Sequence, residues 1–259
     1  VIVFNGEIYN FQSIRENLVK DDCKFLGNSD TEVLLNLYLS EGKAMLSKLN
    51  GIFAFAIWDN RSKLLFVARD ALGVKPLYYF LGDSIFSFSS EIKALLKFIP
   101  KDKELNVESI NRYLSFLWCP GQGTPLKSVH KLLPGEAIIV KDGEIKEKWA
   151  WYQLPIFRGV KGDLTKKDSI SGTVDHLRQA VHRQMVSDVP LGAFLSGGLD
   201  SSAVVAFARE LNPDIRCFSI KTEGKQDPGF VDDLPYARKV AKHLNVSLEV
   251  VSVDSRKMA

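Results

Sequence analysis

The sequence predicts a layered α+β domain with an antiparallel sheet, followed by an α/β domain with a parallel sheet. From Val1 to about Trp149, apolar residues mostly recur with the short period of strands and are separated by turn residues. After about residue 171, strand-like and helix-like segments alternate, which is typical of parallel strands joined by crossover helices. A chain of 259 residues is long enough for two such domains. We therefore expect domains at 1–150 and 171–259, joined by an aperiodic linker at 151–170.

Two hairpins define the expected antiparallel sheet. Phe53, Phe55 and Ile57 alternate before a polar turn, and the apolar pattern resumes at 65–67. The second hairpin surrounds Asp142-Gly143, a pair that readily supplies the positive φ angles of a type I′ turn. A strand at 1–4 precedes both hairpins.

Helices are expected outside this sheet, around 14–18, over 31–41, after Ser90 and after Asn106. Ser29 and Glu32 have the spacing of a capping box, in which each side chain bonds the other residue's backbone N–H. Strands with helices outside them indicate a layered domain.

The second domain begins with a helix whose apolar face is Val174, Leu177, Val181 and Met185. The segments that follow are a strand at 191–195, a helix at 202–211, a strand at 215–220, a helix at 235–244 and a strand at 247–253.

Composition excludes several classes of protein. The formal net charge of +3 is spread along the chain, whereas a nucleic-acid surface needs clustered basic residues. No apolar run is long enough to span a bilayer, and no signal peptide opens the chain. Cys23, Cys119 and Cys217 are widely separated and have no histidine at ligand spacing, which favours isolated thiols in a reducing compartment. We expect a cytoplasmic protein that binds neither nucleic acid nor membranes.

The most specific segment is Ser196-Gly197-Gly198-Leu199-Asp200-Ser201-Ser202, between an expected strand and helix. Two glycines allow the backbone to turn sharply, and a helix N-terminus adds its dipole and N–H groups, so the segment can hold pyrophosphate. The GxxxxGK[ST] lysine is absent, so the loop is not a Walker A motif. The alternative is an ordinary strand-to-helix turn in which Asp200 or Ser201 merely caps the helix.

Residues 188–202 resemble the signature of the N-type ATP-pyrophosphatases, and most closely that of asparagine synthetases. The resemblance implies an adenine nucleotide α-hydrolase-like fold and ATP as cofactor, with Asp200 holding Mg²⁺ on the phosphates. It also implies nucleotide contacts from Leu195 and Ile220, for which the alternative is ordinary core packing. The implied ATP-binding residues are Leu195, Ser196, Gly197, Gly198, Leu199, Asp200, Ser201, Ser202 and Ile220.

Asn5-Gly6-Glu7-Ile8-Tyr9-Asn10, expected as a turn after the first strand, resembles a segment of class II glutamine amidotransferases. That family has an Ntn-hydrolase-like αββα fold. The resemblance implies that Asn5 and Gly6 form an oxyanion hole, and that Glu7 and Asp30 bind the ammonium group of glutamine. For Asp30 the alternative is a helix-starting acid that favours the dipole.

Two further segments, 68–79 and 89–95, are similar to those of the same family, whereas Ala71 departs from its usual arginine. The family's nucleophile, an N-terminal cysteine, would lie upstream of Val1. Cys23 lies in a loop between expected helices and does not fit this role. From the ends of the sequence we expect an internal segment of a longer chain, inactive by itself.

Taken together, the resemblances imply a ligase of asparagine biosynthesis. It would hydrolyse glutamine and pass ammonia to a β-aspartyl-AMP made from aspartate and ATP. One alternative is a related amidotransferase that acts on a sugar acid or closes a β-lactam or peptide ring. Another is a non-catalytic protein with decayed sites. A homodimer is one candidate assembly.

Overall fold

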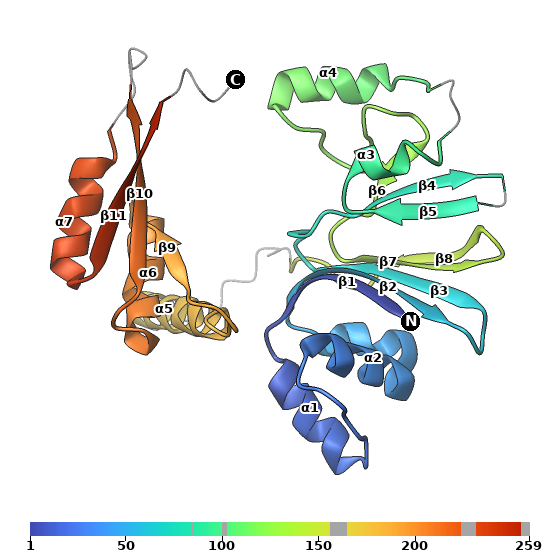
Figure 1. Ribbon diagram of the computed structural model, residues 1–259, viewed down its shortest axis with the longest axis horizontal. Coiled ribbons are helices and arrows are strands. Elements are labelled where there is room, and N and C mark those ends of the chain that lie inside the picture. Colours follow the sequence, from blue (N-terminus) through green and yellow to red (C-terminus); the bar gives the residue numbers. More distant parts are fainter. Residues whose placement is uncertain (84, 100–102, 156–164, 224–231, 255–259) are drawn as a thin grey trace. The chain divides into compact units, whose positions relative to one another are not determined.

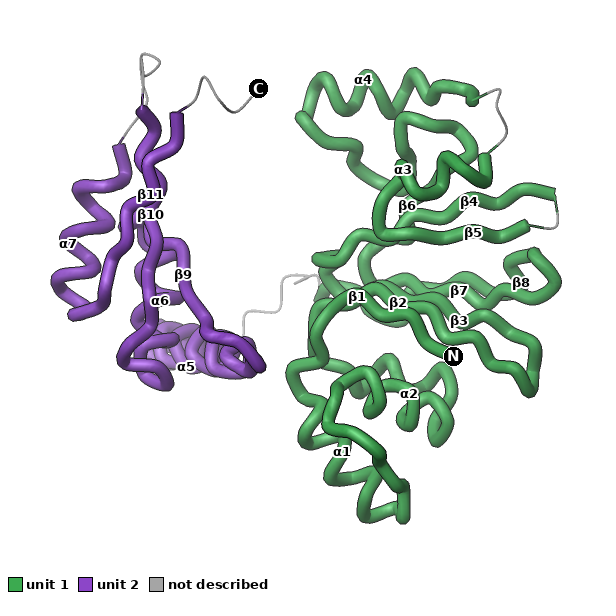
Figure 2. Tube along the Cα trace, in the orientation of Figure 1, with its two compact units in different colours: residues 1–158 green, residues 159–259 purple. Residues whose placement is uncertain are grey.

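The computed structural model describes residues 1–83, 85–99, 103–155, 165–223 and 232–254. The chain divides into two compact units, residues 1–158 and 159–259 (Figure 2). Part of the segment expected as a linker, 156–164, lies outside the described residues. No helix in the described part is long and apolar enough to cross a membrane.

Unit 1 has four layers in the order helix, sheet, sheet, helix, which confirms the αββα architecture (Figure 1). A five-stranded antiparallel sheet has the order β1-β2-β3-β7-β8, and a three-stranded antiparallel sheet has the order β5-β4-β6. The elements are β1 (Ile2–Ile8), α1 (Phe11–Lys20), α2 (Asp30–Glu41), the 3-10 helix η1 (Gly42–Lys48), β2 (Gly51–Asp59), β3 (Leu64–Arg69), β4 (Tyr78–Gly82), β5 (Ile85–Ser89), α3 (Ile92–Leu95), α4 (Val107–Phe116), β6 (Val129–Lys131), β7 (Glu136–Lys141) and β8 (Glu144–Ala150).

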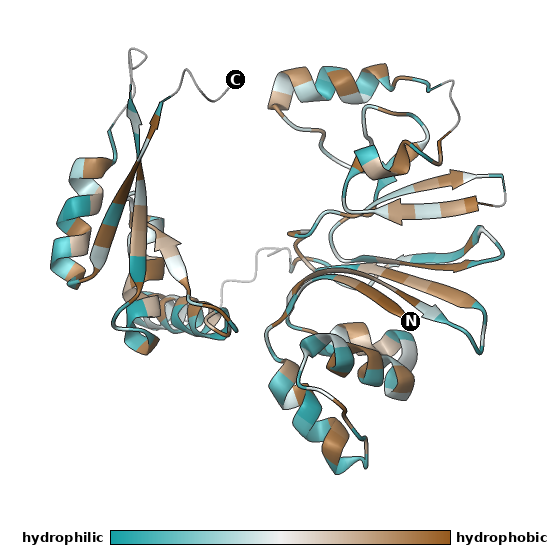
Figure 3. Ribbon diagram, viewed as in Figure 1, coloured by the Kyte–Doolittle hydropathy of each residue, from teal (hydrophilic) through white to brown (hydrophobic). Residues whose placement is uncertain are grey.

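The core of unit 1 follows the alternation of side chains along β2. Phe53, Phe55 and Ile57 face α1 and α2, while Ala54 and Ala56 face the second sheet. β1 and β2 are largely hydrophobic along their length (Figure 3). Because both faces of the large sheet are covered, β2 is a nearly continuous apolar run.

Both expected hairpins form. β2 pairs with β3, and β7 pairs with β8 around a turn in which Asp142 and Gly143 have φ of 54° and 76°. Only one of the two hydrogen bonds of the expected capping box forms at the start of α2. The Ser29 side chain accepts from the Glu32 N–H, but the Glu32 carboxylate accepts from the N–H groups of Leu26 and Gly27 instead.

Unit 2 contains the expected parallel sheet, in the order β11-β10-β9, with helices joining its strands. Its elements are α5 (Lys166–Arg183), β9 (Gly192–Phe194), α6 (Leu199–Leu211), β10 (Arg216–Glu223), α7 (Leu234–Leu244) and β11 (Ser247–Asp254). α5 begins five residues earlier than the pattern predicts, because Thr165 and Asp168 form a complete capping box at its start.

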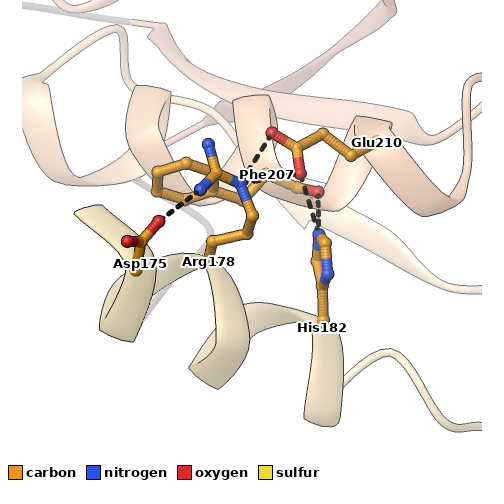
Figure 4. A network of polar contacts seen from close by, with 5 residues as sticks. All are labelled: Asp175, Arg178, His182, Phe207 and Glu210. Atoms are coloured by element: carbon orange, nitrogen blue, oxygen red, sulfur yellow. Dashed lines mark hydrogen bonds and ion pairs between the residues drawn. The ribbon is translucent and has the colours of Figure 1, made fainter. Parts of the chain in front are cut away.

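α5 packs on α6 partly through a polar network (Figure 4). The Arg178 guanidinium bonds the carboxylates of Glu210 and Asp175 at 3.0 Å, and His182 Nε2 lies 3.2 Å from both Glu210 Oε2 and the Phe207 carbonyl oxygen.

The apolar face expected on α5 is only partly buried. Val181 and Met185 pack against the core of unit 2, but Val174 and Leu177 are 37% and 49% exposed. The contact between α5 and α6 therefore combines Val181 and Met185 with the polar network and has no continuous apolar stripe.

Candidate functional sites

The first candidate site lies on β1, the edge strand of the large sheet. The expectation that Asn5 to Asn10 form a turn is wrong for its first four residues, which continue the strand, and only Tyr9 and Asn10 turn. The ladder continues because Gly6 has no side chain: a Cβ there would lie 2.1 Å from the carbonyl oxygen of Ile52. Gly6 therefore allows β1 to approach β2 closely.

Gly6 directs its N–H away from β2. In an antiparallel pair, hydrogen-bonded and non-bonded positions alternate. The Tyr9 N–H donates to the Asn50 carbonyl, which makes the odd-numbered residues of β1 the bonded ones. Opposite Gly6, Phe53 turns its own N–H to Asp70 Oδ2. The Gly6 N–H thus faces the open edge of the sheet.

Asp30 lies on the same edge. Its Oδ2 accepts from the Ile8 N–H at 3.0 Å, and Ile8 occupies the next outward-facing position after Gly6. Asp30 is the first residue of α2 and is half-buried, so it both joins the helix to the strand and keeps a carboxylate beside the edge.

The side chains of Asn5 and Glu7 lie on the face of the large sheet that also carries Ala54, which is the face toward the second sheet. Glu7 is exposed, and Asn5 lines a cavity of about 350 Å³ between the two sheets. Burial, and then the carboxylates of Glu7 and Asp70, raise the pKa of the Tyr9 phenol, so this hydroxyl keeps its proton next to Glu7.

Ser90 and Asp70 are two further residues of this site that were not predicted from the sequence. Asn5 Nδ2 donates to Ser90 Oγ at 3.0 Å. The Asp70 carboxylate is 1% exposed and accepts from four backbone N–H groups. Both residues belong to segments that carry the family resemblance, which was the available signal. Their roles depend on contacts with distant residues.

Cys23 is separated from these groups. It packs with the core between the large sheet and α1 and α2, whereas the Asn5 side chain faces the second sheet. A larger cavity of about 660 Å³ also lies in unit 1, between Arg69, Trp118 and Lys131. None of the sequence-predicted site residues lines it.

The second candidate site is the loop between β9 and α6 in unit 2. Ser196 Oγ lies 2.9 Å from Ser201 Oγ, and the Ser202 hydroxyl donates to the Gly198 carbonyl at 2.6 Å. The N-cap of α6 is Gly198, which offers no side-chain bond, so the alternative that Asp200 or Ser201 caps the helix is wrong. The first N–H groups of α6 therefore remain available to an anion.

The two glycines of this loop differ. Gly197 has φ of 81°, and a Cβ there would lie 2.4 Å from the Ala237 nitrogen in α7. Gly198 has φ of −70°, and its Cβ would meet only Ser196 Oγ at 3.4 Å. A glycine at position 197 is thus required by the packing of α7. At Gly198, which is exposed, the absence of a side chain leaves the start of α6 open to solvent.

Substituting Gly197 by alanine should destabilise unit 2. Positive φ and the contact with α7 each cost about 1–3 kcal/mol. Hydrogen exchange should accelerate in α6 and α7. The matched control is Gly172→Ala in α5, where a Cβ meets nothing within 4 Å and should stabilise the helix by about 0.5–1 kcal/mol. Unchanged exchange in Gly197→Ala would contradict this account of the loop.

Leu195 and Ile220 have different surroundings. Leu195 is 1% exposed and belongs to the core, as the alternative interpretation held. Ile220 is 55% exposed, so the alternative that it packs in the core is wrong. It does not end its strand either, because β10 continues to Glu223. An exposed isoleucine near the strand ends can contact a ligand.

Asp200 lies in the first turn of α6 with an exposed carboxylate. Among the described residues, no group of three or more His, Cys, Asp or Glu side chains could hold a metal ion. A lone carboxylate beside helix N–H groups nevertheless fits Mg²⁺, which proteins often bind through one or two carboxylates together with substrate phosphates. The residues present therefore fit a magnesium–polyphosphate.

Comparison with known proteins divides the chain in a similar way. The model of a family described as a glutamine amidotransferase domain matches residues 1–152, and that of asparagine synthase matches residues 173–259. Asparagine synthetase [glutamine-hydrolyzing] 1 of Bacillus subtilis is 38% identical over 95% of this chain and 38% of its own length. A putative asparagine synthetase [glutamine-hydrolyzing] 2 of Methanocaldococcus jannaschii is 37% identical over 94% of this chain and 46% of its own.

Other relatives differ in name. Amidase chry2 of Gibberella zeae is 30% identical over 97% of this chain and 39% of its own length. The solved glutamine phosphoribosylpyrophosphate amidotransferase from Bacillus subtilis has a TM-score of 0.44 and 16% identity, and covers 98% of this chain and 61% of that one. The chain thus spans less than half the length of these curated relatives.

Proposed function

The chain belongs to the glutamine amidotransferase domain family, and on that premise we propose that its protein hydrolyses glutamine and uses the ammonia in an ATP-dependent synthesis of asparagine from aspartate. The observation that carries the proposal is the edge of β1. There the Gly6 N–H faces outward, two residues from the bond between Ile8 and Asp30. Asn5 adds a carboxamide from the same strand.

These groups suit amide hydrolysis. The tetrahedral intermediate carries negative charge on the former carbonyl oxygen, and the Asn5 Nδ2 and the Gly6 N–H are donors that can face it. Glu7 and Asp30 supply carboxylates for the α-ammonium group of glutamine. The nucleophile in this proposal is an N-terminal cysteine preceding Val1, as the family resemblance implies.

Unit 2 would bind the nucleotide. When bound, Mg²⁺-ATP would supply the AMP that activates a carboxylate, with pyrophosphate as the leaving group. The free N–H groups at the start of α6 would hold the leaving phosphates, Asp200 would hold the cation, and exposed Ile220 would contact the nucleotide. Leu195, 1% exposed, would contribute through its backbone only.

A second candidate keeps both half-reactions and changes the acceptor carboxylate. The similarity to amidase chry2, beside that to asparagine synthetases, favours keeping this candidate. Feeding the whole protein ATP, glutamine and either aspartate or other carboxylates, and measuring pyrophosphate release, separates the two candidates. Release that depends on aspartate supports asparagine synthesis, and release only with another acid supports the second candidate.

Replacing Asp30 by asparagine tests the glutamine site. Asparagine keeps an oxygen for the Ile8 N–H but removes the charge that would pair with ammonium. A hydrogen bond to a charged group contributes about 1.5–3 kcal/mol, so the KM for glutamine should rise roughly 10- to 100-fold. Synthesis from free ammonia should be unaffected, because it does not use this site.

The control is Glu32→Gln, which removes another acid from the first turn of α2. It should leave the glutamine KM unchanged. If glutamine- and ammonia-dependent rates of Asp30→Asn fall together, or if only the melting temperature falls, Asp30 is structural and the assignment is wrong.

A further inference from the structure

The contact between Asn5 and Ser90 joins two layers of unit 1. Asn5 lies on the edge strand of the five-stranded sheet, and Ser90 directly follows β5 of the three-stranded sheet. The Asn5 Nδ2 donates to Ser90 Oγ across 3.0 Å, although 85 positions separate the residues in sequence. It is a side-chain hydrogen bond that spans the space between the two sheets.

Ser90 has a firm support. The preceding residue, Ser89, is paired with Tyr78 of β4. Shortly after Ser90, α3 is anchored by Leu95, which is 1% exposed. A residue held between a paired strand and a helix anchored in the core can fix the position of a partner side chain.

Few polar groups other than Ser90 surround the Asn5 side chain. Both side chains line the cavity of about 350 Å³, whose other lining is mostly apolar, including Ala54, Leu77 and Phe88. A carboxamide has two N–H donors and one oxygen, and rotation by 180° exchanges them. Ser90 accepts from one N–H, which holds the amide nitrogen in place and leaves its second N–H for another acceptor.

We propose that Ser90 is a positioning residue for glutamine hydrolysis, because its hydroxyl holds the Asn5 carboxamide nitrogen in place, so that the second N–H of this nitrogen can face the developing oxyanion. This inference rests on the proposed function. If the carboxamide rotated, its oxygen would face the negative charge and oppose the transition state. Binding of glutamine in the ground state, through Glu7 and Asp30, would be unaffected.

The test compares Ser90→Ala with Ser90→Thr in the whole protein. Removing an oxyanion donor outright lowers kcat about 100- to 1000-fold, so loosening one should lower the kcat for glutamine hydrolysis by about 10-fold or more. The KM for glutamine and the ammonia-dependent rate should not change. Ser90→Thr keeps a hydroxyl and should restore kcat.

Two controls isolate the contact. Ser89→Ala removes the neighbouring hydroxyl in the same cavity, which bonds Glu91 instead, and should leave kcat unchanged. In the Asn5→Ala background, Ser90→Ala should have no further effect, because a residue that acts only through Asn5 has nothing left to position.

The outcomes separate the two proposals. If Asn5→Ala retains full glutaminase activity, the oxyanion-hole assignment fails and the proposed function with it. If Asn5→Ala is inactive but Ser90→Ala matches the wild type, the positioning role alone is overturned. A loss from Ser90→Ala that persists in the Asn5→Ala background, or that Ser90→Thr does not rescue, also overturns it.

Discussion

Replacing Asp200 by alanine in the whole protein is expected to abolish ATP–pyrophosphate exchange while leaving unit 2 folded. The carboxylate is exposed in the first turn of α6, where it does not cap the helix, so the fold does not depend on it. In the proposed site it holds Mg²⁺ on the phosphates. Loss of a group that stabilises transition-state charge typically costs 100- to 1000-fold in rate, or about 3–4 kcal/mol.

Gly198→Val should have the same effect for a different reason. Its φ of −70° and ψ of 166° suit valine, so the backbone should not change. The added side chain would occupy the space in which the phosphates approach the helix N-terminus. The control is Asp214→Ala, which removes an exposed carboxylate beyond the other end of α6 and should leave exchange intact. Exchange retained in both Asp200→Ala and Gly198→Val would show that this loop does not bind pyrophosphate.

Replacing Asp70 by alanine should have the largest effect on the stability of unit 1. Its Oδ1 accepts from the N–H groups of Leu72 and Val74, and its Oδ2 from those of Phe53 and Lys75. Hydrogen bonds to charged groups contribute about 1.5–3 kcal/mol each, so even with partial compensation the loss should exceed about 3 kcal/mol.

Asparagine should not rescue position 70, because its amide nitrogen would face two N–H donors where a carboxylate oxygen had accepted. All four tryptophans of the chain lie in unit 1, so denaturant unfolding followed by tryptophan fluorescence measures this change. Asp59→Asn, at an exposed turn with bonds to Arg61 and Ser62, is the control and should cost much less. Equal stability of Asp70→Ala and the unchanged chain would mean that these bonds do not hold the loop.

Local signals in the sequence were sufficient for much of the fold. The Asp142-Gly143 turn, the alternation along β2 and the strand–loop–helix order around Gly197 and Gly198 all formed as expected. Each depends on the dihedral preferences or side-chain period of a few neighbouring residues, and these are written in the local sequence.

The prediction from local sequence was wrong where a distant segment decided the structure. It placed Asn5 to Ile8 in a turn, because an isolated Asn-Gly pair favours one. In the fold, β2 pairs with these residues, and the missing Cβ of Gly6 serves close approach to Ile52. It also ended β10 at Ile220, although pairing with β11 extends the strand to Glu223.

The sequence by itself thus determined the types of the two sheets, antiparallel and then parallel, and indicated the segments in which chemistry is expected. Only the tertiary structure decided that Gly197 is required by α7 and that Ser90 meets Asn5. These contacts join residues 40 and 85 positions apart. Hydrophobic period and turn preference act over a few residues, whereas such contacts depend on strand register and on the packing of whole layers, which no short segment encodes.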